Sequence, residues 1–431
     1  MKILIIAYYF PPQNVIASLR PYSWAKFFYD NGHDITIATV PKNKHTNDLD
    51  YDISKFKIVE EDFNIPLKTV NNSINSKSNE KKQKVTLLET VYKSLKKFVF
   101  DFSAKTGILY GTRFPDLRMS WVDKSVKKLS SESFDVIIST GCPYIVHSIA
   151  YELKQKNKNT IWIMDWRDLW TKNSNVKGLK IFHGYESNLE KKYHDSCDFI
   201  TTVSEGLAEA LQQITEKNIH VIYNGYNPDE LNCLFQRSRK KNTKLTITYV
   251  GTIYKGFRDP EPLFKAIREL IDEDKLSELD IELIFAGQNA DVFDLIQNYH
   301  LEKCYKYLGI VKREKSLELQ YDSDVLLFLE CEHKTKGILT GKLFEYLSLG
   351  RKVWAIGIEN ENSAGTLICE SNIGVCLGNS IDKIKNEILS YFTEKEKENE
   401  VNMELISQFT RENQSKKLLN LIEEYRGGQY K

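Results

Sequence analysis

The sequence predicts an α/β fold made of two doubly wound, Rossmann-like parallel-sheet domains that face a central cleft. Three observations support this prediction. The 431 residues exceed what one ordinary hydrophobic core accommodates. Apolar segments of strand length alternate with segments of helix length, which is the pattern of βαβ units. A polar, basic stretch at 235–244 interrupts this alternation, which then begins afresh.

The first domain is predicted to span residues 1–226. It opens with a fully apolar strand, a helix at about 19–29 and a helix stop at Asn31-Gly32. Residues 42–132 show no clear strand and are interpreted as an insertion. A last amphipathic helix, at about 402–431, is expected to join this domain. The expected strands are 1–10, 34–40, 134–140, 160–166, 199–203 and 220–225.

The second domain is predicted to span residues 227–401. Its series of apolar segments has the same length and spacing as the first series, so a second parallel sheet follows. The expected strands are 245–251, 281–287, 305–311, 324–330, 352–357 and 374–377.

Composition excludes several classes of protein. The 60 basic and 59 acidic side chains nearly cancel, so no global field favours nucleic acid. The seven cysteines are scattered and include no CxxC pair, which fits a reduced, cytoplasmic compartment. No apolar run approaches the roughly 18 residues that span a bilayer. The histidines show no metal-ligand spacing, and we predict no metal site.

The segment TGKLFEYLSLGRKVWAIG, residues 340–357, is the most informative one. A helix is expected to begin near Thr340 and Gly341 and to end at Gly350 before a strand. Lys342 and Glu345 lie three residues apart and therefore share a helical face. Free N–H groups at the helix start, together with the Lys342 ammonium, suit a phosphate, and Glu345 can accept hydrogen bonds from ribose hydroxyls. An exposed ion pair is the alternative.

Three other segments follow predicted strands, where ligands of parallel sheets bind. In VGTIYKGFRDPEPLFKAI, residues 250–267, Lys255 and Arg258 can hold phosphate, and Arg258 is preferred because a guanidinium binds bidentately. In MDWRDLW, residues 164–170, two acids, an arginine and two tryptophans suit a carbohydrate. In FPPQNVIASLR, residues 10–20, Asn14 and Arg20 are candidates for contact with an acceptor.

These segments resemble the retaining family-4 glycosyltransferases of the two-domain GT-B fold, whose second domain carries a KxxEYLxxG helix followed by a strand. The resemblance implies that Glu345 holds the donor ribose and that Gly251 and Thr252 line the diphosphate site. YLGIV, residues 307–311, resembles the segment near the nucleobase, which implicates Val311. MDWRDLW resembles the acceptor side, which implicates Asp165, Arg167 and Asp168. The chain departs from the family pattern at Gly337 and Thr252, where the family has a glutamate and an arginine.

We therefore predict a metal-independent hexosyltransferase-type enzyme, with Lys342, Arg258 and Asp165 as the catalytic residues. The resemblance implies transfer of a sugar from a nucleotide-diphosphate sugar, with UDP and GDP both open, onto a glycan or lipid-linked acceptor in cell-surface polysaccharide synthesis. The anomeric configuration would be retained, and the nucleotide-sugar is a substrate, so no cofactor is expected. Residues 85–100 have the pattern of an interfacial helix, which would give peripheral contact with the inner face of the plasma membrane, or of an ordinary amphipathic surface helix.

Two alternatives stay open. A nucleotide-sugar epimerase shares the two-domain architecture but needs no second substrate. A non-catalytic nucleotide-binding protein would account for the departures at Gly337 and Thr252.

Overall fold

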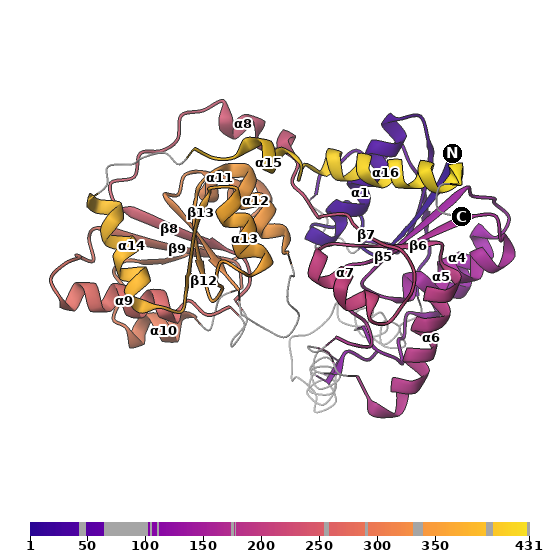
Figure 1. Cartoon of the computed structure of the whole chain (residues 1–431), viewed down its shortest axis with the longest axis horizontal. Helices are drawn as coiled ribbons and strands as arrows, with labels where there is room; N and C mark the ends of the chain where they lie inside the picture. Colours follow the sequence, from indigo (N-terminus) through magenta and orange to yellow (C-terminus); the bar gives the residue numbers. More distant parts are fainter. Residues whose placement is uncertain are drawn as a thin grey trace, which may run out of the picture. The chain divides into compact units, whose positions relative to one another are not determined.

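The computed structural model consists of two α/β domains, each built on a parallel sheet (Figure 1). The structure describes residues 1–42, 49–63, 102–103, 106–109, 112–173, 176, 178–253, 258–288, 292–330, 339–393 and 400–428. The first domain comprises Met1–Ile222 and Ser415–Lys431, and the second comprises Tyr223–Gln414.

The sheet of the first domain has the strand order β3-β2-β1-β4-β5-β6-β7, and all pairs are parallel. The order reverses between β1 and β4, so this position is the topological switch point. The strands are β1 (Lys2–Ala7), β2 (Asp34–Thr39), β3 (Lys57–Glu60), β4 (Val136–Gly141), β5 (Ile161–Trp166), β6 (Phe199–Thr202) and β7 (Ile219–Val221).

Both faces of this sheet are covered, which explains why its strands are continuously apolar. Ile3 and Ile5 of β1 pack on one face with side chains of α1 and α16, whereas Leu4 and Ile6 pack on the other with side chains of α4, α5, α6 and α7. The helices are α1 (Ile16–Asp30), α4 (Met119–Leu129), α5 (Ile145–Lys156), α6 (His183–Ser196), α7 (Glu205–Gln212) and α16 (Arg411–Gly427), with a 3-10 turn η2 (Lys180–Phe182).

The sheet of the second domain has the order β10-β9-β8-β11-β12-β13, also wholly parallel, with its switch point between β8 and β11. The strands are β8 (Leu245–Val250), β9 (Ile281–Ala286), β10 (Tyr305–Tyr307), β11 (Val325–Leu329), β12 (Lys352–Ile356) and β13 (Gly374–Gly378). All six strands predicted for this domain are therefore confirmed.

Helices cover both faces of the second sheet as well. Side chains of α9, α10 and α14 pack on one face, and those of α11, α12, α13 and α15 pack on the other. The helices are α8 (Asn232–Phe235), α9 (Glu261–Asp272), α10 (Val292–Asn298), α11 (Arg313–Tyr321), α12 (Gly341–Leu349), α13 (Ser363–Glu370), α14 (Ile381–Thr393) and α15 (Met403–Ser407), with a 3-10 turn η3 (Pro228–Leu231).

The structure corrects the interpretation of residues 42–132 as a strand-free insertion. β3 lies within this range and pairs with β2 at the edge of the sheet, and α4 follows it. β3 has only four residues, two of them exposed, so it lacks the apolar run that marks the central strands. The predicted helix at 85–100 lies outside the described residues.

The chain passes between the domains twice, at Ile222–Tyr223 and at Gln414–Ser415. The second crossing falls inside α16, so α15 and the first residues of α16 belong to the second domain, whereas the prediction gave 402–431 to the first. In the described part of the chain, no helix combines the length and apolarity that a membrane crossing requires.

Candidate functional site

The switch point of the second sheet gathers the charged groups expected to hold a phosphate. β8 and β11 lie next to each other there, and the chain leaves them at Gly251 and Glu330. α12 begins at Gly341, with Thr340 as an extended N-cap residue whose side chain does not cap the helix. The Leu343 N–H donates a hydrogen bond to the Thr340 carbonyl oxygen at 3.1 Å, which leaves the N–H groups of Gly341 and Lys342 as those that suit an anion.

Lys342 reaches from the first turn of α12 to the end of β8. Its ammonium donates a hydrogen bond to the Val250 carbonyl oxygen and lies 3.7 Å from the centre of the Tyr249 ring. Gly251 makes this approach possible, because a Cβ at that position would come within 2.2 Å of Lys342 Nζ. Gly251 also has a φ of 149°, a conformation that side chains disfavour.

The pKa of Lys342 is lowered to about 7. Burial is the main cause and the neighbouring Arg258 guanidinium adds to it, while Glu345 and Glu330 act in the opposite direction. An anion bound here would raise this pKa again, because it would favour the charged form of the lysine.

Arg258 is held beside the same strand end. Its Nη1 donates a hydrogen bond to the Thr252 carbonyl oxygen at 3.2 Å, and the Tyr249 hydroxyl donates to the same oxygen at 3.0 Å. Thr252, which stands where the resembling family has an arginine, therefore contributes a backbone acceptor that positions Arg258. Lys255 and Gly337 lie outside the described residues.

Glu330, the first residue after β11, is a member of this site that we did not predict. Burial raises the pKa of its carboxyl, whereas Arg258 and Lys342 lower it, with a net increase. The rule that ligands bind after parallel strands points to this position. The KxxE spacing of Lys342 and Glu345 instead indicated a site on α12.

Glu345 is not an exposed partner of Lys342 but accepts a hydrogen bond from Arg313 Nη1 at 2.9 Å. The Arg313 guanidinium also binds Glu230, with Nε 3.0 Å from its Oε2, and Glu230 in turn pairs with Arg411 at 3.4 Å. Glu345 is 14% exposed, so its carboxylate is held in a fixed position. Val311 lies two residues before Arg313, which brings the predicted nucleobase segment next to the predicted ribose carboxylate.

The switch point of the first sheet is built around Arg167. Its guanidinium donates hydrogen bonds to the carbonyl oxygens of Gly141 and Cys142, after β4, and of Ala17 in α1. The Ala17 carbonyl is available because Pro21, four residues later, has no N–H to donate to it. Arg167 therefore joins the loops that follow β1 and β4.

Asp165 and Arg20 form a buried ion pair, with exposures of 0% and 3%, and Asp165 Oδ1 lies 2.7 Å from Arg20 Nη2. The hydroxyls of Thr140 and Thr201 also donate to this carboxylate, at 2.7 and 2.8 Å. Burial alone would raise the pKa of Asp165, but Arg20 and these hydroxyls lower it overall. In this arrangement the buried side chains of Asp165 and Arg20 connect α1, β4, β5 and β6.

Asp168 and Asn14 remain accessible near the same switch point. Asp168 is exposed, although partial desolvation raises the pKa of its carboxyl against the effect of Arg167. Asn14 is half-buried in the loop before α1. Of the predicted acceptor residues, these two therefore offer side chains to a bound molecule, whereas the guanidinium of Arg167 is engaged by backbone carbonyls.

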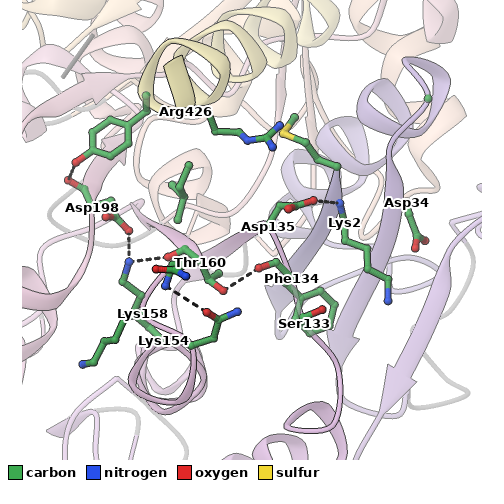
Figure 2. A pocket seen from close by; sticks show the side chains of 16 residues that line it. Lys2, Asp34, Ser133, Phe134, Asp135, Lys154, Lys158, Thr160, Asp198 and Arg426 are labelled. Atoms are coloured by element: carbon green, nitrogen blue, oxygen red, sulfur yellow. Dashed lines mark hydrogen bonds and ion pairs between the residues drawn. The ribbon is translucent and has the colours of Figure 1, made fainter. Parts of the chain in front are cut away.

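A groove of about 920 Å³ lies at the amino ends of the strands of the first sheet, opposite the switch-point loops (Figure 2). It is lined by residues at the amino ends of β1, β4 and β5 and by Arg426 of α16. Lys154 Nζ lies 2.7 Å from Asp198 Oδ2, and Asp135 accepts a hydrogen bond from the Lys2 backbone N–H at 2.7 Å. These contacts join the amino ends of strands, whereas ligands of such sheets bind beyond the carboxyl ends. Among the described residues no group of three or more metal-binding side chains occurs.

Comparison with known proteins identifies the fold. Residues 97–230 match the model of Glycosyltransferase Family 4. Sucrose-phosphate synthase from Thermosynechococcus elongatus has a TM-score of 0.61 at 12% identity, covering 99% of this chain and 100% of that chain. An E. coli structure described as trehalose-6-phosphate bound with UDP-2-fluoro glucose has a TM-score of 0.63 at 11% identity, covering 98% and 99%.

The chain has the GT-B fold. The predicted resemblance to the family-4 glycosyltransferases is confirmed over residues 97–230. A UDP-N-acetylglucosamine 2-epimerase is also similar, with a TM-score of 0.53 at 11% identity, covering 99% of this chain and 96% of that chain. No curated protein sequence matches the chain. The matched range, residues 97–230, contains MDWRDLW but not Lys342. The description of the Lys342 site in this GT-B protein therefore rests on the contacts given above.

The buried pair predicts the effect of an Asp165→Asn substitution. It would remove the negative charge that is paired with the buried Arg20 guanidinium, and we expect a loss of about 3 to 5 kcal/mol in the free energy of unfolding. Urea denaturation followed by tryptophan fluorescence measures this, because Trp24, Trp121, Trp162, Trp166 and Trp170 all lie in the first domain. Asp168→Asn is the matched control and should change stability by less than about 0.5 kcal/mol. Unaltered stability of Asp165→Asn would show that the carboxylate is not structural.

The lowered pKa of Lys342 predicts a pH-dependent cost to stability. Between pH 7 and pH 10 the unfolded chain holds a proton on this lysine more tightly than the folded chain does, so its contribution to folding becomes more favourable as pH rises. Lys342→Met should therefore have a higher Tm than the unmodified protein at pH 7, and the difference should shrink toward pH 10. The exposed Lys312→Met serves as control. A Tm difference that is independent of pH would contradict the lowered pKa.

Proposed function

We propose that this protein is a metal-independent, retaining glycosyltransferase that moves a sugar from a nucleotide-diphosphate sugar to a glycan or lipid-linked acceptor. The observation that carries the proposal is the pairing of Lys342 and Arg258 with the open start of α12 at the switch point of the second sheet. Two cations and free backbone N–H groups at one place suit a diphosphate. The similarity to a structure that holds UDP-2-fluoro glucose supports a nucleotide-sugar donor.

In the proposed reaction, the bond between the anomeric carbon and the diphosphate oxygen breaks, and a bond from that carbon to the acceptor oxygen forms on the same face. The hydroxyl proton passes to the departing diphosphate, so no separate protein base is required. Negative charge increases on the diphosphate as the bond breaks. Lys342, Arg258 and the Gly341 N–H would stabilise this charge, and donors of this kind each contribute about 3 kcal/mol to lowering the barrier.

The roles at either end of the donor follow the resemblance. Glu345, oriented by Arg313, would accept hydrogen bonds from the ribose, and Val311 would lie at the nucleobase. Gly251 and Thr252 would approach the diphosphate through their backbone, and Lys255 would add positive charge. In the first domain, Asp168 and Asn14 would contact the acceptor, within a loop arrangement that Arg167 maintains.

The proposed setting is the cytoplasm, with the acceptor at the inner face of the plasma membrane and the product destined for a cell-surface polysaccharide. Contact with the membrane would be peripheral and would use residues 85–100. The epimerase similarity supports a second candidate, a nucleotide-sugar epimerase, because that fold also binds a nucleotide-sugar. The two differ in whether a second substrate is consumed.

The proposed activity predicts turnover only when both substrates are present. Incubation with UDP- and GDP-sugars plus a lipid-extract or oligosaccharide acceptor should release nucleoside diphosphate, and EDTA should leave the rate unchanged. Lys342→Met should lower kcat at least about 100-fold, because it removes one preorganised donor to the leaving group. Conversion of the donor alone into an epimer would favour the epimerase. Abolition of activity by EDTA would contradict metal independence.

The Arg313–Glu345 contact predicts a selective effect on donor affinity. Glu345→Gln and Arg313→Gln should each raise the donor KM by about 10-fold with little change in kcat, because both weaken the same ribose contact. Their effects should not add in the double variant, since the arginine acts through the glutamate. Exposed Lys315→Gln on the same helix is the matched control. Additive effects would mean that Arg313 binds the donor independently.

A further inference from the structure

Glu330 is a glutamate next to the cations Lys342 and Arg258. It follows β11 directly at the switch point, and its backbone N–H donates a hydrogen bond to the Ile356 carbonyl oxygen at 3.2 Å. β11 and β12 therefore determine its position. Its side chain extends from the same edge of the sheet as the strand end that receives Lys342.

The Glu330 carboxylate has an unused oxygen. Oε2 is buried and has no hydrogen-bond partner among the residues that the structure describes. Lys342 and Arg258 act on this carboxylate electrostatically and lower its pKa, against the effect of burial. The Lys342 ammonium donates a hydrogen bond to the Val250 carbonyl, and Arg258 Nη1 donates one to the Thr252 carbonyl. A buried acceptor without a donor destabilises a fold, so such groups call for an explanation.

The chemistry of the carboxylate restricts what could bind it. An ionised carboxylate only accepts hydrogen bonds, so it repels a diphosphate and attracts a hydroxyl group. Two carboxylates, Glu330 and Glu345, act on Lys342. A nucleotide-sugar matches this arrangement, because its anionic diphosphate lies between two rings that carry hydroxyl groups. Arg313 holds Glu345, which is the carboxylate proposed for the ribose, and Glu330 remains for the other ring.

We propose that Glu330 binds the sugar of the donor by accepting a hydrogen bond from one of its hydroxyl groups, and so contributes to the choice of sugar. This inference rests on the proposed function, because it assumes a nucleotide-sugar at the Lys342 site. The competing explanation is structural: Glu330 would only offset the positive charges of Lys342 and Arg258. The two explanations predict opposite behaviour when the carboxylate is removed.

The test compares ligands with and without the sugar. UDP, GDP, UDP-glucose and GDP-mannose are titrated by calorimetry into the unmodified protein, Glu330→Gln and Glu330→Ala. For the nucleotide that binds, the sugar-bearing ligand should lose affinity by about 10-fold in Glu330→Gln and up to about 100-fold in Glu330→Ala. The nucleoside diphosphate should bind equally well or more tightly, because a negative charge near the diphosphate has been removed.

Thermal unfolding without ligand provides the second measurement. If the carboxylate serves a ligand, neither variant should have a lower Tm than the unmodified protein, since each removes a carboxylate whose buried Oε2 lacks a donor among the described residues. Glu302→Gln, at an exposed glutamate of the same domain, is the matched control for both measurements.

A lower Tm in both Glu330 variants, or an equal loss of affinity for the nucleoside diphosphate and the nucleotide-sugar, would overturn the inference and leave the proposed function intact. The same holds if neither variant changes the binding of either ligand. If the unmodified protein binds none of the four ligands, the proposed donor site itself is wrong, and the inference falls with it.

Discussion

The position of the Lys342 ammonium is the constraint on which the donor-side arrangement depends. α12 brings the lysine to the end of β8, where the Val250 carbonyl and the Tyr249 ring hold its charge, and Gly251 leaves the room that a side chain would fill. The same burial that lowers its pKa makes the charged lysine costly on its own. Binding of an anion would stabilise the charged form of Lys342, which burial disfavours, so we expect the site to favour an anionic ligand.

The two sheets place charged groups at equivalent topological positions but use them differently. In the first domain, the polar groups near the switch point bind one another: Asp165 is saturated by Arg20 and two hydroxyls, and Arg167 by three carbonyls. Such closed networks rigidify loops. In the second domain, the network closes around Glu345 through Arg313 but leaves Glu330 open. The second arrangement therefore leaves a buried carboxylate oxygen available to a ligand.

The sequence predicted most of the fold because both sheets are buried on two faces, and buried parallel strands are recognisable as continuous apolar runs. β3 was missed because an edge strand of four residues, two of them exposed, has no such run. Lys342 was found because helix spacing and a glycine stop locate it. Asp165 was assigned to the acceptor because a carboxylate after a strand can face either a ligand or neighbouring strands, and only the tertiary contacts distinguish these. Arg313 could not be predicted, since its partner Glu345 lies 32 residues away and no local pattern links them.

The departure at Thr252 shows how a site can keep its charge when a side chain changes. Where the resembling family has an arginine after the glycine, this chain has a threonine, so the guanidinium cannot come from that position. Its carbonyl instead receives Arg258, six residues later, and the Tyr249 hydroxyl donates to the same oxygen. Because Tyr249 also lies under the Lys342 ammonium, one buried ring supports both cations. Residue 252 thus contributes to the site through its backbone carbonyl and not through its side chain. A prediction based on side-chain motifs alone would have overlooked this role.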